Sequence, residues 1–250
     1  MESKKVIINS SLISFLEESV PQKEYLLLLH GWRCSAETMQ GLADVFKQDF
    51  SIIAIDFPGF GYSDLPKEGL DIQGYTEMIH SFLLKKDLKK VHILGHSFGG
   101  RIGINFAAQF PEKVQSLILI NSGGIKNNSC KIKIINFLAK FALKLGLKKY
   151  KKYFYKIFLK EKDVLHAQKN LSLEKTFRKI VSEDLLNQAK KITCPCLLLW
   201  GATDTETPLE HGKIWHEHIY KSELYVHPGD HFFFLQNPEW VYKHVQTFLK

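Results

Sequence analysis

Hydrophobic residues along this chain form short, continuously apolar runs that alternate with longer segments of helical periodicity. Such runs are typical of strands buried on both faces of a sheet, because an exposed face would require alternating polar residues. The predicted strands are 25–30, 51–55, 91–94, 114–120, 196–200 and 223–226. The predicted helices are 35–46, 72–85, 99–109 and 238–250. Strands that alternate with helices predict an α/β protein with a mainly parallel sheet covered on both faces.

Two segments depart from this alternation. Residues 6–8 and 12–16 are short apolar runs joined by Asn9-Ser10-Ser11, which predicts an antiparallel pair at the start of the chain. The segment from 124 to about 191 is rich in Lys, Leu, Ile and Phe and shows no strand–helix alternation. We therefore predict a core formed by residues 1–123 and 192–250, with residues 124–191 inserted as a helical lid.

Composition places the chain among soluble globular proteins. Of its 250 residues, 45% are hydrophobic and 24% are charged, which suits one large domain or one domain with an insertion. Glu17 and Glu18 interrupt the only early apolar stretch, so no signal peptide is expected. The longest purely aliphatic run before a polar residue is Leu26 to Leu29, which is far too short to cross a bilayer. These features predict a cytoplasmic protein.

Positive charge is concentrated in the predicted lid. The net charge is +8, and residues 126–191 contain 18 Lys and Arg against 5 Asp and Glu. A lysine-rich helix with one apolar face could lie on an anionic membrane, or its field could steer anionic substrates. A solvated lysine face is the interpretation that we favour. The basic run 148–152 belongs to no recognised nucleic-acid-binding module, so a small molecule is the expected partner.

The cysteines give little support for a metal site. Cys194 and Cys196 form a C-x-C pair, but no histidine or second cysteine pair accompanies them at metal-binding spacing. We predict that these two, with Cys34 and Cys130, are reduced structural thiols. Neither a metal nor a cofactor is expected.

The candidate nucleophile is Ser97, in the sequence Gly95-His96-Ser97-Phe98-Gly99. This G-x-S-x-G motif follows a predicted strand and opens a predicted helix, which is the context that a nucleophile elbow requires. A sharp turn would hold the serine in a strained conformation above the sheet, and a larger side chain at either glycine would collide with neighbouring backbone. The start of the helix also favours negative charge that develops near Ser97.

A serine hydroxyl needs a base, and His231 is the favoured candidate among eleven histidines. It follows Pro228-Gly229-Asp230 in the turn after the last predicted strand, at the sheet edge where ligands meet an open α/β sheet. His227 falls at the strand end, before that turn. His30 and His96 lie at strand ends, and the His96 side chain is expected to project away from the serine hydroxyl. His211, His216 and His218 have the spacing of a solvated helix face.

Asp204 is the candidate partner of this base, because it lies just past the strand that ends near Trp200. A carboxylate there could fix the imidazole tautomer and stabilise the imidazolium. Asp230 is adjacent to His231, but sequence neighbours rarely face each other. The resulting order of serine, aspartate and histidine along the chain is that of hydrolase elbows.

The fourth expected component is an oxyanion hole. His30-Gly31-Trp32 follows the first buried strand, where a backbone amide could converge on the space above the elbow. The Trp32 and Phe98 amides are therefore the predicted donors. Gly31, Trp32, Phe98 and Phe232 are the candidate pocket residues, although Phe232, Phe233 and Phe234 are better explained as anchors of the histidine loop and the last helix.

Taken together, these motifs resemble the α/β-hydrolase superfamily, nearer its compact bacterial carboxylesterases and carbon–carbon bond (meta-cleavage product) hydrolases than its large lipases. The D-x-P-G-x-G-x-S pattern is specific to the family and occurs here at 56–63. The resemblance implies an eight-stranded sheet with a helical cap inserted after the sixth strand. Relatives that hydrolyse epoxides or haloalkanes use an aspartate as nucleophile, so Ser97 argues against both activities.

Hydrolysis of a carboxylic ester, or a closely related acyl bond, through an acyl-enzyme is the expected function. Cleavage of a carbon–carbon bond in a dienone acid would use the same triad and would suit a basic lid. A catalytically silent binding module on a hydrolase fold is the alternative from a different class, since a fold does not fix a function. An intact triad and oxyanion hole argue against that alternative.

Overall fold

The fold is described from a computed structural model, which describes residues 1–126 and 171–250. Eight strands form one sheet in the order β1-β2-β4-β3-β5-β6-β7-β8. The strands are β1 (Glu2–Ile8), β2 (Ser11–Glu18), β3 (Tyr25–Leu29), β4 (Ser51–Ile55), β5 (Val91–His96), β6 (Val114–Ile120), β7 (Cys196–Gly201) and β8 (Ser222–His227). The predicted fold class is confirmed.

The sheet is antiparallel at one edge and parallel elsewhere. β1 pairs with β2, and β2 pairs with β4, in antiparallel register. Every pairing from β4 through β3, β5, β6 and β7 to β8 is parallel. The carboxyl ends of the parallel strands therefore share one edge of the sheet, where loops from different strands can meet.

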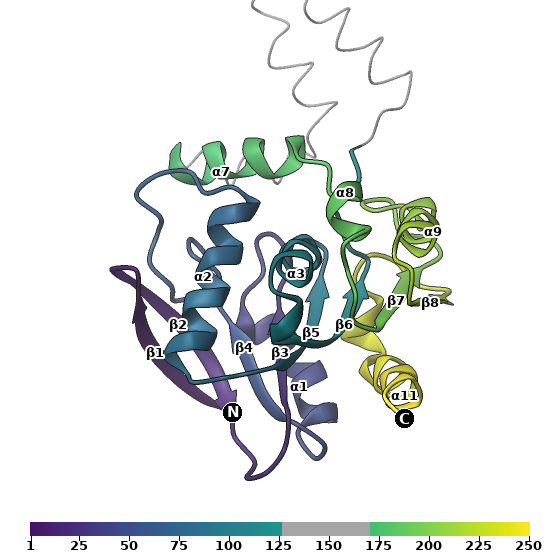
Figure 1. Cartoon of the computed structure of the whole chain (residues 1–250), viewed down its shortest axis with the longest axis horizontal. Coiled ribbons are helices and arrows are strands. Elements are labelled where there is room, and N and C mark those ends of the chain that lie inside the picture. Colours follow the sequence, from purple (N-terminus) through teal and green to yellow (C-terminus); the bar gives the residue numbers. More distant parts are fainter. Residues whose placement is uncertain (127–170) are drawn as a thin grey trace, which may run out of the picture.

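Helices cover both faces of this sheet (Figure 1). The α-helices are α1 (Gln40–Phe46), α2 (Ile72–Lys85), α3 (Phe98–Gln109), α7 (Leu171–Ser182), α8 (Leu186–Ala189), α9 (Leu209–His218), α10 (Phe233–Gln236) and α11 (Pro238–Phe248). Two short 3₁₀ helices, Ala36–Met39 and Pro111–Lys113, precede α1 and β6. The Asp71 side chain caps α2 by accepting a hydrogen bond from Gly74 N at 2.9 Å.

Side chains at alternate positions of the buried strands pack into two hydrophobic cores, one on each face of the sheet. Leu27, Leu29 and Ile93 belong to the core beneath α2 and α3. Leu26 and Leu28 point to the opposite face and join the core that contains residues of α1 and α11. Burial on both faces explains why these strands are continuously apolar.

The segment predicted to be an insertion lies between β6 and β7, and hydrogen bonds join its described ends. Leu185 N donates to Gly124 O at 2.8 Å, and Lys126 N donates to Asp184 Oδ2 at 2.9 Å. Residues 127–170, which hold most of the predicted lid, its apolar positions 134–145, its basic run 148–152 and Cys130, lie outside the described residues. The described end of this predicted insertion forms α7 and α8.

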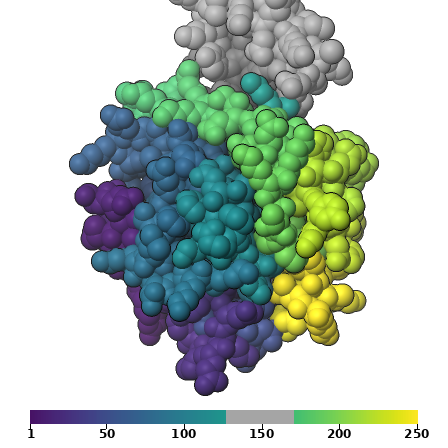
Figure 2. All heavy atoms as spheres, viewed as in Figure 1, coloured from purple at the N-terminus to yellow at the C-terminus, as the bar shows by residue number. Residues whose placement is uncertain are grey.

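Hydrogen bonds along helix α7 join it to the core. Ser172 Oγ donates to Pro66 O at 2.6 Å, and Lys179 Nζ donates to Gly69 O at 2.7 Å. At its other end, Arg101 from α3 donates to Ile180 O at 2.7 Å. Figure 2 shows α7 and α8, in green, lying against the blue and teal residues of the core.

The structure bears on two further expectations, one about membrane-spanning segments and one about the exposure of three histidines. No helix in the described ranges is long and apolar enough to span a bilayer. His216 is exposed as predicted, but the prediction of a solvated face is wrong for His211, whose Nδ1 is buried without a hydrogen-bond partner. Burial, followed by the charge of Arg101, lowers the pKa of His211, although the nearby charge of Asp204 acts to raise it.

Candidate active site

Ser97 occupies a strained backbone conformation between β5 and α3. Its φ is 50° and its ψ is −105°, values that L-residues rarely adopt. The turn that produces this conformation needs glycine on both sides. A Cβ atom at Gly95 would lie 2.7 Å from Gly99 C, and one at Gly99 would lie 2.1 Å from Leu29 O. The sequence therefore folds locally into the strand–turn–helix junction that the motif predicts.

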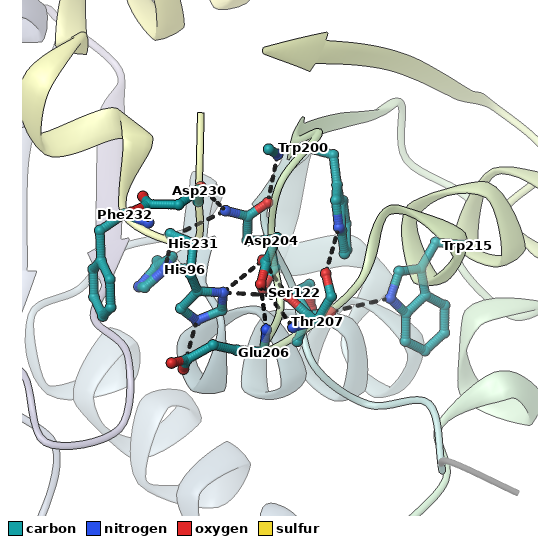
Figure 3. Close-up of polar contacts among 12 residues, drawn as sticks. His96, Ser122, Trp200, Asp204, Glu206, Thr207, Trp215, Asp230, His231 and Phe232 are labelled. Carbon is teal, nitrogen blue, oxygen red and sulfur yellow. Dashed lines mark hydrogen bonds and ion pairs between the residues drawn. The ribbon is translucent and has the colours of Figure 1, made fainter. Parts of the chain in front are cut away.

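His231 and Asp204 meet at the carboxyl edge of the sheet. His231 Nδ1 and Asp204 Oδ2 are 2.6 Å apart, and both residues are buried (Figure 3). Burial alone would raise the pKa of the Asp204 carboxyl, but the hydrogen bond and charge of His231 and the contacts with Thr207 outweigh it. The pKa of Asp204 is consequently lowered. The carboxylate thus stays ionised, which suits a group that orients and stabilises an imidazolium.

Thr207 and Asn121 hold the two loops in place, and neither was predicted from the sequence. The Thr207 hydroxyl lies 2.8 Å from Asp204 Oδ2 and 3.0 Å from Asn121 O. The Asn121 amide donates to Asp230 O at 3.1 Å and to His231 O at 2.9 Å, and its Oδ1 accepts from Gly201 N at 2.8 Å. Asn121 thereby ties the end of β6 to the loops that carry the acid and the base.

The sequence located His96 at the end of a strand but gave it no role in the site. Its Nε2 donates to His231 O at 3.0 Å, so the residue before Ser97 is bonded to the backbone of the candidate base. Burial, followed by the proximity of His231, lowers the pKa of His96 well below its ordinary value, and the ring is neutral. Its position one residue before the serine was visible in the sequence, but the long-range contact was not.

The predicted oxyanion donors lie on neighbouring segments. Phe98 is the first residue of α3, whose early amides have no intrahelical acceptor. Because Gly99 is pressed against Leu29 O and His30 O, the start of α3 lies close to the end of β3, just before Trp32. The Trp32 and Phe98 rings are also in contact, with centroids 5.5 Å apart. These amides can serve one oxyanion only if both point above Ser97, which stays a prediction.

Aromatic rings gather around the predicted pocket residues. Trp32 contacts Phe60 with ring centroids 4.8 Å apart and contacts Phe177 of α7 at 5.2 Å.

Phe232 is partly exposed and lies against His231, with ring centroids 5.1 Å apart, whereas Phe233 and Phe234 are buried. Phe233 also contacts Trp240 of α11, with ring centroids 5.5 Å apart, which fits the expected role as an anchor of the last helix, whereas Phe232 remains at the site. Gly31 is buried beside His96, where a Cβ would lie 2.8 Å from Nδ1.

Hydrogen bonds join the loop at 56–64 to the residues that follow β3. Asp56 accepts hydrogen bonds from Ala36 N at 2.7 Å and Tyr62 N at 3.0 Å. His30 Nδ1 contacts Gly31 O at 2.7 Å, so its Nε2 is free to accept from Phe57 N at 3.1 Å. Burial lowers the pKa of His30 to about 4, although Gly31 and Asp56 act to raise it. His30 is thus a neutral structural residue rather than a base.

The structure brings Asp204 and His231 together and places Ser97 on its elbow. Asp230 does not compete with Asp204, because its Oδ1 accepts from Phe232 N at 2.9 Å. Within the described residues, no hydrogen bond joins the Ser97 hydroxyl to His231, so that contact stays a prediction. Cys194 and Cys196 are buried and free, and Cys34 is half-buried and free.

A family profile described as "alpha/beta hydrolase fold" matches residues 24–145. An uncharacterized protein of Mycobacterium tuberculosis is 37% identical over 100 residues, which are 40% of this chain and 29% of that protein. A mouse protein named "Serine hydrolase-like protein" is 37% identical over 99 residues, which are 39% of this chain and 32% of that protein. The chain therefore spans about a third or less of the length of these two relatives.

Other similarities cover most of the chain. The "Uncharacterized hydrolase YugF" of Bacillus subtilis is 26% identical over 92% of this chain and 91% of that protein. The crystal structure of a bacterial membrane phospholipase A superposes with a TM-score of 0.78 and 22% identity, over 99% of this chain and 85% of that one. With the observed sheet, these matches confirm the resemblance to the α/β-hydrolase superfamily. The chain has the α/β-hydrolase fold.

Proposed function

We propose that this chain is a serine hydrolase that cleaves a carboxylic ester or a related acyl bond of a small substrate. The observation that carries the proposal is the Ser97 backbone, held at a φ of 50° on a junction whose glycines leave no room for a side chain. Strain of this kind is retained where the surrounding structure enforces it and function uses it. The buried hydrogen bond between His231 and Asp204 supports the same proposal.

The proposed reaction proceeds through an acyl-enzyme. Ser97 Oγ attacks the ester carbonyl carbon while His231 Nε2 takes the hydroxyl proton, and the Trp32 and Phe98 amides stabilise the oxyanion. Collapse of the tetrahedral intermediate breaks the bond to the alcohol oxygen, which receives the proton from Nε2. A water molecule then repeats these steps on the acyl-enzyme and releases the carboxylic acid.

A panel of p-nitrophenyl esters of rising acyl length, compared with a dienone acid, tests this function and its substrate range. We expect ester turnover that Ser97→Ala reduces by roughly three or more decades in kcat, by analogy with other triads. Ser116→Ala is the matched control, because Ser116 is also buried beside a histidine, 2.8 Å from His92 Nδ1, but lies at the start of β6. Undiminished ester turnover by folded Ser97→Ala would contradict the proposal.

A further inference from the structure

Four aromatic rings from separate segments of the chain pack together at the predicted pocket. The Trp32 ring lies at the centre of this group, with its centroid 4.8 Å from that of Phe60 and 5.2 Å from that of Phe177 in α7. Its centroid is also 5.5 Å from that of Phe98, at the start of α3. Phe60 and Phe98 are buried, whereas Trp32 and Phe177 each keep part of their surface exposed. Trp32 and Phe177 are therefore the rings of this group that a bound molecule can contact.

Phe177 is the member of this group that comes from the segment between β6 and β7. It lies one turn after buried Leu173, so both side chains share the face of α7 that is turned toward the core. Shortly after Phe177, Ile180 O accepts a hydrogen bond of 2.7 Å from Arg101 of α3. α7 lies across the carboxyl edge of the sheet (Figure 1). The Phe177 ring is consequently held beside Trp32 by a helix that is itself bonded to the core.

The proposed reaction places the two parts of the ester on different sides of the carbonyl carbon. The alcohol oxygen takes its proton from His231 Nε2, so the alcohol lies on the side of His231 and of Phe232, whose ring centroids are 5.1 Å apart. The carbonyl oxygen points to the predicted donors, the Trp32 and Phe98 amides. The acyl chain leaves the same carbon away from the alcohol. We therefore expect it to extend toward the exposed surfaces of Trp32 and Phe177.

We propose that Phe177 limits the length of the acyl group and makes short apolar acyl esters the preferred substrates. This inference rests on the proposed function. Each methylene group that becomes buried against the rings should raise kcat/KM about fourfold. A chain that is long enough to reach Phe177 meets a ring that α7 holds in place, so further methylene groups should lower kcat/KM instead.

The ratio of kcat/KM for p-nitrophenyl octanoate to that for p-nitrophenyl butyrate tests this limit, because the two esters share one leaving group. The ratio should lie below one for the unaltered protein. Phe177→Ala should raise it by about tenfold, the gain expected when two further methylene groups become buried. Phe177→Trp should lower it, because a larger ring leaves less room. Leu171→Ala is the matched control, since Leu171 is on the same helix but 66% exposed, and it should leave the ratio unchanged.

The outcomes separate this inference from the proposed function. If Ser97→Ala is inactive toward both esters and folded Phe177→Ala keeps the original ratio, the inference about Phe177 is wrong and the hydrolase proposal stands. An equal change of the ratio in Leu171→Ala would also overturn it. If Phe177→Ala does not fold, Phe177→Leu provides the same test with a smaller expected rise. If Ser97→Ala hydrolyses both esters as fast as the unaltered protein, both proposals are wrong.

Discussion

Asp204 and Asp230 both lie next to His231, and their hydrogen bonds separate their roles. Asp204 contacts the imidazole nitrogen, whereas the Asp230 side chain is engaged with the backbone of Phe232. The candidate acid is therefore defined by the atom that it contacts and not by its distance along the sequence. Thr207 completes this arrangement, because its hydroxyl lies within 3.3 Å of His231 Nδ1 as well as close to Asp204.

Replacement of each acid by its amide should distinguish the two aspartates. Asp204→Asn favours the imidazole tautomer that cannot accept the serine proton, so we expect kcat to fall on the order of ten-thousand-fold. Asp230→Asn should keep most activity, because an amide oxygen can still accept from Phe232 N. The measurement is kcat for a p-nitrophenyl ester with both folded variants. If Asp230→Asn were the more damaged of the two, the acid would have to be reassigned.

At the residue scale, the sequence predicted site residues that follow strand ends. It missed side chains that hydrogen-bond to residues far away in the sequence. Ser97, Asp204 and His231 each follow a recognisable strand, so their shared edge could be inferred. His96 contacts His231 across 135 positions, and Asn121 contacts it across 110. Nothing local marks such pairs. The only signal for Asn121 was its place directly after a predicted strand.

The elbow is the element on which the site depends, and it is formed by the close approach of α3 to β3. Gly99 permits this approach, since a Cβ there would meet the backbone of Leu29 and His30. Gly95, in β5, has the same function, because a Cβ there would meet the backbone of Gly99 and Gly100. A helix start that is held this tightly fixes the backbone of Ser97 at a φ of 50°.

Gly99→Ala and Gly41→Ala form a matched pair that measures this contact. Gly99→Ala should lower the free energy of unfolding by about 3 kcal/mol, because backbone must move to admit the methyl group. At Gly41, an exposed position in α1, an added Cβ meets nothing within 4 Å. Gly41→Ala should therefore raise that free energy by about 0.5–1 kcal/mol. Equal effects in urea denaturation would mean that the contact at Gly99 is unimportant.

The extents of the elements could be predicted where burial imposed a pattern. α2 spans 72–85 and β6 spans 114–120, as predicted, because two-sided burial leaves continuous apolar runs and one-sided burial leaves a helical stripe. The attachment of α7 could not be predicted in this way. It depends on Arg101, the charged residue of α3, whose pKa burial lowers to about 10. A charge at such a position was the available signal.

For the molecule as a whole, two cores on opposite faces of one sheet enclose histidines that cannot easily be protonated. His30 and His96 are both buried at the carboxyl ends of parallel strands. Their neutral rings bridge the central strands to the loops of the site through hydrogen bonds to Phe57 and His231. Acid stability of the fold and integrity of the site are consequently linked.

This burial predicts how stability changes with pH. Burial lowers the pKa of folded His30 from 6.5 to about 4, so between these values the unfolded chain binds the extra proton. Its contribution to stability is complete above pH 6.5 and is lost as the pH falls toward 4, by about 3 kcal/mol in total. His96 acts in the same direction. Urea denaturation across this range should give a smaller pH slope for His30→Gln than for the unaltered protein, and equal slopes would contradict the assignment.

Covalent labelling with a fluorophosphonate probe tests the central claim most directly. Such a probe reacts with an activated serine, so the unaltered protein should gain one adduct, located on Ser97 by peptide mass spectrometry. Ser97→Ala should gain none, and Ser116→Ala should label at the normal rate. An adduct on another residue, or equal labelling of folded Ser97→Ala, would contradict the assignment of Ser97 as the nucleophile.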